Sequence, residues 1–229
     1  MFAGDVLYKV SKYLDIKMNA GTNYRLPTFN DLYWQPGGNP DLKPEDSFTS
    51  EIGLLFKKTT WNLEATSFLI KNENLIKWIP EQGDFWVPQN IQKSRNYGFE
   101  LDFEYKLKLN EHHFSFDSQY TYVKSVDMNT DMQLIYNPEH KANQVLRYQR
   151  GTFGLEYNLA YTGKVFTTTS NTQSLDPYWL SNIYANYNLG QYNLNFILSL
   201  NNLFDQPYQV IAYRPMPGRN INLTINYQI

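Results

Sequence analysis

Apolar and polar residues alternate with a period of two along almost the whole chain. Residues 97–108 show this clearly, because Tyr97, Phe99 and Leu101 oppose Gly98 and Glu100, and the pattern continues to residue 108. Successive side chains of a β-strand point to opposite faces, so this period predicts strands with one apolar and one polar face. Helical periodicity is nearly absent. The chain is therefore expected to be an all-β protein.

About eleven strands are predicted, and the connections between them alternate between short and long. The expected strands are residues 2–10, 13–25, 46–57, 61–78, 95–108, 112–126, 139–150, 152–164, 178–189, 191–202 and 218–229. The expected long loops are residues 26–45, 79–94, 127–138, 165–177 and 203–217. Such alternation predicts an antiparallel up-and-down meander whose two ends face different surroundings, as in a transmembrane β-barrel.

Composition helps to choose between a transmembrane β-barrel and a soluble β-sandwich or propeller. Charged residues are 18% of the chain and aromatic residues 17%, with 19 tyrosines. The polar strand faces carry mostly Asn, Gln, Thr and Ser, where a soluble sandwich would usually carry Lys and Glu. The predicted strands also suit the ~9–11 residues that cross a bilayer at a tilt. These features favour the barrel. A helical membrane protein is excluded, because no run approaches ~18 apolar residues.

Charge and cysteine content exclude several other classes of partner and site. The net charge of −2 argues against a nucleic-acid partner, and the absence of cysteine excludes disulfides and thiolate chemistry. The first ten residues lack a secretion signal, so the chain is expected to be either cytosolic or a part of something longer.

Catalytic and metal sites find little support in the sequence. His112 and His113 are adjacent, so on a strand they point to opposite faces, and His140 has no second ligand at a suitable spacing. One polar face carries Glu100, Asp102 and Glu104, which could be ligands of a hard cation or part of a hydrated wall. The neighbouring lysines favour the hydrated wall. We expect no catalytic residue, no bound metal and no cofactor.

Several motifs resemble the C-terminal half of the barrel of TonB-dependent outer-membrane receptors. They are the segments 23–33 (NYRLPTFNDLY), 38–45 (GNPDLKPE), 50–53 (SEIG), 97–100 (YGFE), 202–205 (NLFD) and 215–220 (PMPGRN). In the second of these, Pro40 and Pro44 cannot continue a strand ladder and predict a stiff loop base. The final Ile229 departs from the aromatic residue with which the family usually ends.

The resemblance implies a 22-stranded barrel that encloses an N-terminal plug domain. Residues 1–229 would then be the C-terminal part of the barrel, about half of its strands, with the plug absent. It implies a receptor in the outer membrane of a Gram-negative bacterium that imports a scarce, bulky nutrient, cobalamin or an iron chelate. The implied partners are outer-membrane lipid, the missing barrel half and plug, that small-molecule nutrient, and the TonB energy-coupling protein through the missing N-terminal part. A passive porin or structural barrel without energy coupling is the alternative.

Large side chains in the long loops are the candidates for nutrient binding. They are Tyr33, Trp34, Phe85, Trp86, Tyr136, Tyr213 and Arg214. Such side chains cover a bulky ligand while few rotatable bonds become ordered. The alternative is that Trp86 and Tyr136 only cap the barrel wall.

Glu51 and Glu100 are the candidates for plug docking. The alternation places both on the polar face of the strands, two strands apart. The matching glutamates of the family pair with arginines of the plug, which implies the same role here. The alternative is two hydrated carboxylates among the others of the wall.

Overall fold

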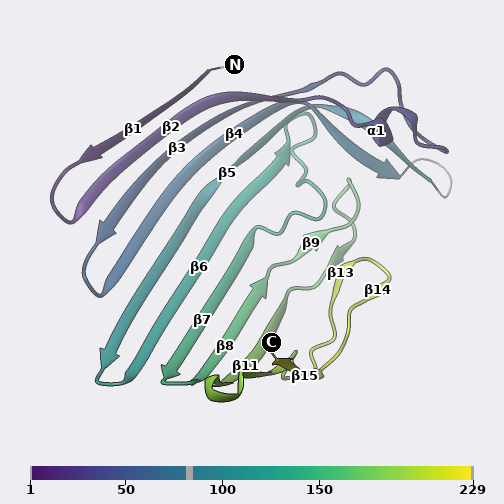
Figure 1. Ribbon diagram of the computed structural model, residues 1–229. Helices are drawn as coiled ribbons and strands as arrows, with labels where there is room; N and C mark the ends of the chain where they lie inside the picture. Colours follow the sequence, from purple (N-terminus) through teal and green to yellow (C-terminus); the bar gives the residue numbers. More distant parts are fainter. Residues whose placement is uncertain (1, 81–84, 228–229) are drawn as a thin grey trace.

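One curved antiparallel sheet of eleven strands makes up most of the protein (Figure 1). The computed structural model describes residues 2–80 and 85–227. The strands of the sheet are, in order, β1 (Ala3–Lys9), β2 (Leu14–Arg25), β3 (Glu45–Lys57), β4 (Trp61–Pro80), β5 (Trp86–Leu109), β6 (His112–Asp127), β7 (His140–Arg150), β8 (Phe153–Thr162), β11 (Tyr178–Leu189), β12 (Leu194–Asn201) and β15 (Asn220–Tyr227). This confirms the all-β meander and its eleven strands.

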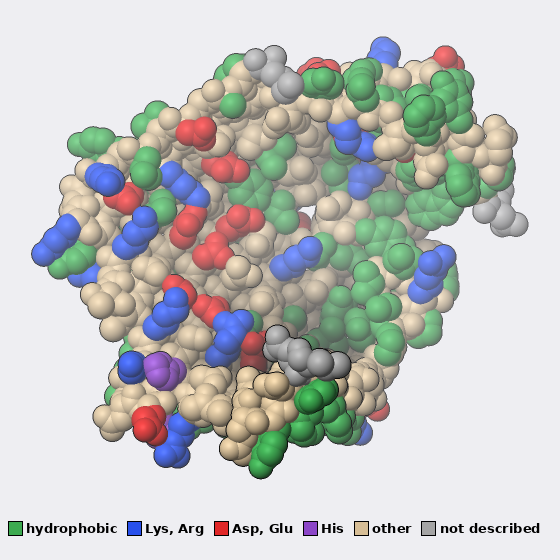
Figure 2. Space-filling view, viewed as in Figure 1, with side chains coloured by type: hydrophobic (Ala, Val, Ile, Leu, Met, Phe, Trp, Pro, Cys, Tyr) green, Lys and Arg blue, Asp and Glu red, His purple; other side chains and the backbone are tan. Residues whose placement is uncertain are grey.

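The sheet is open between its first and last strands in the described part of the chain. Each strand pairs with the next, and β1 and β15 are the two ends of the order. The sheet curves around a hollowed face, on which acidic and basic side chains gather over β2 to β7 (Figure 2). The molecule is therefore an arc of a barrel, and we call the hollowed face the inner face.

The alternation of the sequence becomes a difference between the two faces of this arc. Met18, Ile52, Leu146 and Leu198 all point to the outer face and are 47–50% exposed. Most buried apolar side chains lie instead under the loops at one end of the strands: Leu42, Ile76, Val126, Leu134, Ile135 and Val165. The apolar surface of the strands thus faces away from the protein, as a lipid-facing wall requires. No helix among the described residues is long and apolar enough to cross a membrane.

The region predicted as a loop over residues 79–94 is instead mostly strand, so that prediction was wrong. β4 runs to Pro80 and β5 starts at Trp86, and their pairing continues to the Pro80–Trp86 pair. Residues 81–84 of the predicted loop lie outside the described residues, as do residues 228–229 of the predicted last strand. β4 and β5 thus extend well beyond the neighbouring strands as a projecting hairpin, which we call the β4–β5 extension (residues 74–80 and 86–92).

Short elements also occur inside three of the predicted loops. They are α1 (Phe29–Tyr33), the pair β9 (Val165–Phe166) and β10 (Ser174–Leu175), and the pair β13 (Gln209–Ile211) and β14 (Arg214–Pro215). A 3-10 turn, η1 (Gly190–Tyr192), joins β11 to β12 at the opposite end of the sheet. All three looped regions lie at the end of the strands from which the β4–β5 extension projects (Figure 1).

Candidate functional site: the loop end and the inner wall

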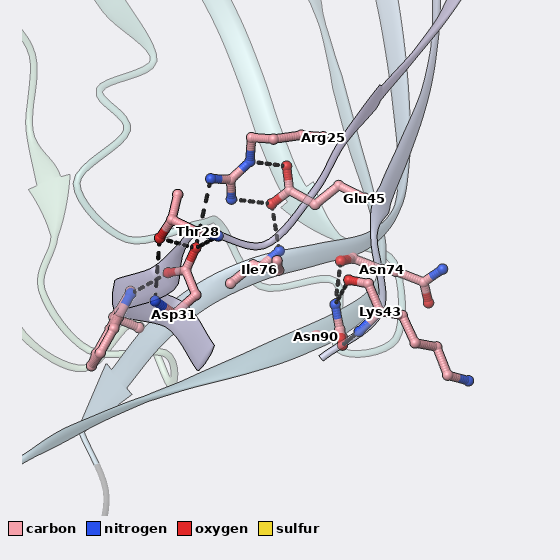
Figure 3. Close-up of polar contacts among 9 residues, drawn as sticks. Arg25, Thr28, Asp31, Lys43, Glu45, Asn74, Ile76 and Asn90 are labelled. Atoms are coloured by element: carbon pink, nitrogen blue, oxygen red, sulfur yellow. Dashed lines mark hydrogen bonds and ion pairs between the residues drawn. The ribbon is translucent and has the colours of Figure 1, made fainter. Parts of the chain in front are cut away.

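The loop between β2 and β3 is anchored where the two strands end. Arg25 is the last residue of β2, Glu45 is the first of β3, and the register places them opposite each other. The Arg25 Nε donates to Glu45 Oε2 and its Nη2 donates to Oε1, both at 2.7 Å (Figure 3). Paired bonds of this kind fix geometry as well as charge. They close the base of the loop.

Asp31 ties the helix of this loop to the β4–β5 extension. Thr28 and Asp31 form a capping box, in which the Thr28 N–H donates to Asp31 Oδ2 (2.8 Å) and the Asp31 N–H donates to Thr28 Oγ1 (3.2 Å). The Trp78 Nε1 donates to Asp31 Oδ1 at 2.8 Å. Burial raises the pKa of the Asp31 carboxyl, but the hydrogen bonds from Thr28 and Trp78 and the charge of Arg25 outweigh it and hold that pKa below its ordinary value. The carboxylate is therefore charged and structural.

The second half of the loop is bound to the same extension. Asn90 accepts from the Lys43 N–H (2.9 Å) and donates to the Lys43 carbonyl (3.1 Å) and the Asn74 carbonyl (2.6 Å). The Ile76 N–H donates to Glu45 Oε1 at 2.6 Å. The stiff loop base predicted from the GNPDLKPE segment is thus a clamp on β4 and β5, and the side chains that complete it come from the extension.

Three of the predicted ligand residues come together above this clamp. Trp34, Phe85 and Trp86 line one pocket of about 570 Å³. We call it the aromatic pocket; its other lining residues are Thr28, Asn30, Asp31, Pro36 and Trp78. Tyr33 is not among them; its ring lies beside that of Phe29, with centroids 6.0 Å apart.

Gly37 explains how closely the two sides of the pocket approach. A Cβ at this position would lie 2.5 Å from the Trp86 carbonyl oxygen, and its φ of +111° is one that only glycine adopts readily. The loop therefore reaches the backbone of β5 directly, and this contact places Trp34 beside Trp86.

The remaining predicted ligand residues form a second group. The Tyr136 hydroxyl accepts from the Ala212 N–H at 3.4 Å, beside Tyr213 and Arg214 at the tip of the β13–β14 hairpin. Tyr213 is 88% exposed. The seven predicted residues thus divide into the aromatic pocket, this exposed tip, and Tyr33 apart from both.

Glu51 and Glu100 lie on the inner face, as the alternation predicted. Glu51 is opposite Phe68, and Glu100 is opposite Thr66, two residues away on β4. Among the described residues neither carboxylate has a Lys or Arg within ion-pair distance, whereas Glu64 on the same face pairs with Lys17. They are two uncompensated charges on one patch of wall.

The residues that sequence reasoning missed are Trp78, Asp31 and Asn90. Trp78 was assigned to the end of a strand, and Asp31 and Asn90 were read as loop residues. The capping pattern of Thr28 and Asp31 before an apolar residue was the one local signal available. No cluster of three or more His, Asp or Glu side chains suited to a metal occurs in the part of the chain that the structure describes.

Comparison with known proteins identifies the family. A family model described as "TonB dependent receptor-like, beta-barrel" matches residues 2–203. The chain belongs to the TonB-dependent receptor family. Its relatives in this family are named as transporters and receptors, not as enzymes.

Two curated relatives and two solved structures show how much of such a receptor the chain covers. It is 33% identical to the vitamin B12 transporter BtuB of Photobacterium profundum, over 96% of this chain and 36% of that protein. It is 31% identical to the vitamin B12 transporter BtuB of Vibrio vulnificus (strain YJ016), over 95% and 35%. The copper transporter OprC superposes with a TM-score of 0.83 at 16% identity, covering 98% of this chain and 39% of that one. The ferric-catecholate import receptor Fiu of E. coli K12 gives 0.76 at 24% identity, covering 97% and 34%. The chain thus spans about a third of the length of the TonB-dependent receptors it matches.

Proposed function

We propose that the chain is the C-terminal part, residues 1–229, of a TonB-dependent receptor barrel that imports a bulky, scarce nutrient across the outer membrane of a Gram-negative bacterium. Cobalamin or an iron chelate fits best, because the relatives include vitamin B12 transporters and a hemin receptor of Yersinia pestis. Energy would come from the TonB protein through a plug domain that this chain does not contain. The open edges of β1 and β15 would pair with the rest of the barrel.

The aromatic pocket is the observation that carries the nutrient-binding part of this proposal. Three tryptophans and one phenylalanine line it, and the clamp beneath holds its two sides in place. Large rigid rings held in advance bury ligand surface at a small entropic cost. Its volume of about 570 Å³ lies within the usual ~300–1,000 Å³ of ligand sites.

Alanine substitution tests this assignment in the assembled receptor. Trp34→Ala and Trp86→Ala are each expected to weaken nutrient binding about tenfold or more, as for a buried aromatic anchor. Trp179→Ala is the matched control, because this tryptophan is on the outer face and 53% exposed. Unchanged affinity in both pocket variants would reject the pocket as the nutrient site.

Energy coupling is tested separately from binding. Uptake of the nutrient should stop when the TonB protein is deleted or the proton gradient is collapsed, while binding at the cell surface persists. Uptake that continues at the same rate under both conditions would instead support the passive porin.

Glu51 and Glu100 are proposed to hold arginines of the plug against the inner face. Two uncompensated carboxylates on one patch suit paired cations, and Arg–carboxylate bonds give a geometrically specific contact. Glu51→Gln with Glu100→Gln should raise the passive leak of small solutes. The control is Glu73→Gln with Glu111→Gln, which removes two exposed carboxylates outside this patch. Leak and uptake at wild-type levels in the first pair would contradict plug docking.

A further inference from the structure

A group of cations lies on the outer face of the sheet, at the end of the strands that carries the loops. Lys71 of β4 is opposite Arg95 of β5. Two residues further along β5, nearer the centre of the strands, Tyr97 is opposite Lys124 of β6. Residues opposite one another in an antiparallel ladder point to the same face, and Lys71 is also opposite the outward Phe48. All three cations therefore point away from the inner face.

The position of this group matches the surface of a bilayer. Below it, the outward side chains of β5 are apolar or aromatic without interruption: Tyr97, Phe99, Leu101, Phe103, Tyr105 and Leu107. From the first to the last of these is about 34 Å along the strand at about 3.4 Å per residue, or about 26 Å in height at a tilt of about 40°. The apolar band of such barrels is about 25 Å tall. Lys71 and Arg95 stand at the first step above this band, at the level of lipid headgroups.

The charges of this group are largely uncompensated. Lys93 also points outward and pairs with Glu73 at 3.4 Å, and Asp46 is opposite Glu73 on the same step. Lys71, Arg95 and Lys124, in contrast, have no carboxylate within ion-pair distance among the described residues.

The side chain of Arg95 also lacks a hydrogen-bond acceptor. Its Nε is buried and has no partner in the part of the chain described here, and its guanidinium lies 5.3 Å from the centre of the Tyr97 ring. The two terminal nitrogens of this guanidinium are not buried and also have no acceptor among the described residues, so they are the atoms that an external acceptor can reach. A guanidinium with two ammonium groups beside it suits a phosphate oxygen.

We propose that Lys71, Arg95 and Lys124 form a binding site for the phosphate of an outer-leaflet lipid headgroup. Tyr97 supports the guanidinium from below, and the apolar band beneath it contacts the acyl chains of the same lipid. The site lies on the opposite face of the sheet from Glu51 and Glu100, and it is separate from the aromatic pocket.

Native mass spectrometry of the receptor in detergent tests this site, with diphosphorylated lipid A, monophosphorylated lipid A and inorganic phosphate as the three probes. Each cation near a membrane surface strengthens anionic lipid binding about fivefold. Lys71→Gln with Arg95→Gln and Lys124→Gln should therefore weaken binding of diphosphorylated lipid A about 100-fold. Monophosphorylated lipid A should bind more weakly than the diphosphorylated form to the wild type.

Two further variants separate this effect from misfolding and from net charge. Lys71→Gln with Lys124→Gln keeps the partly buried Arg95 and should still weaken binding about 25-fold. Lys108→Gln with Lys141→Gln removes the same charge from the inner face and should leave binding unchanged. An equal loss in this control, or no loss in the first pair, overturns the proposal. Inorganic phosphate that binds as tightly as the lipid overturns the assignment to a headgroup.

Discussion

The ion pair of Arg25 and Glu45 allows a quantitative test of the clamp. The perturbation is a double-mutant cycle of Arg25→Gln and Glu45→Gln, read out as the free energy of local opening of residues 26–44. Both bonds of the pair are 2.7 Å long, and the side chain of Glu45 is only 13% exposed. Hydrogen bonds to charged groups contribute about 1.5–3 kcal/mol each.

The exposure of the arginine reduces this contribution. The Arg25 side chain is 49% exposed, so solvent screens the pair on one side. We therefore expect a coupling free energy of about 2 kcal/mol, less than two full bonds would give. At this value the pair lowers the opening equilibrium about 30-fold.

Hydrogen–deuterium exchange of residues 26–44 measures this opening in the four proteins of the cycle. The control cycle uses Lys93→Gln and Glu73→Gln, because that pair also joins two neighbouring strands, at 3.4 Å, but its side chains are 56% and 61% exposed. Its coupling should be below about 0.5 kcal/mol. An Arg25–Glu45 coupling as small as that of the control would refute the reasoning that burial makes this pair the anchor of the loop.

Three further outcomes follow from the structure. The pKa of Asp31 is lowered in the folded protein, so its contribution to loop stability is complete above the ordinary value of 3.8 and is lost as the pH falls through the lower folded-state value. Hydrogen–deuterium exchange of residues 26–44, corrected for intrinsic rates, should therefore stay constant from about pH 7 to pH 5 and rise below about pH 4. Gly98→Ala places a Cβ 1.9 Å from the Tyr122 carbonyl oxygen, so the free energy of unfolding measured in urea should fall by about 1–3 kcal/mol. An unchanged midpoint of the urea transition would contradict the close contact of β5 and β6. Because β1 and β15 do not pair with each other, residues 1–229 expressed alone should form no closed monomeric pore in planar bilayers at low protein concentration.

The strands of the sheet were predictable because each lies between two different environments. Where one face meets lipid and the other water, the sequence must alternate, and strands such as β8 and β12 follow the predicted ranges closely. The inward orientation of Glu51 and Glu100 follows from the same rule.

The β4–β5 extension was not predictable, because another part of the chain covers one of its faces. Protein covers one face with the loop before β3, which Trp78 and Asn90 contact, so the alternation weakens there. Pro80 and Pro88 also signal a loop, yet both are paired residues of the hairpin. The aromatic pocket was missed as a unit for the same reason, since its two sides are joined by contacts between residues nearly fifty positions apart.

The clamp and the aromatic pocket share one consequence for how such a receptor changes during evolution. Every bond of the clamp, and every lining residue of the pocket, lies between Arg25 and Asn90. This single stretch runs from the end of β2 into β5, so recombination between related genes at its two ends would transfer the pocket together with its support. Under the proposed function, one exchange would then transfer a new ligand preference, while the sheet from β6 to β15 stays as it was.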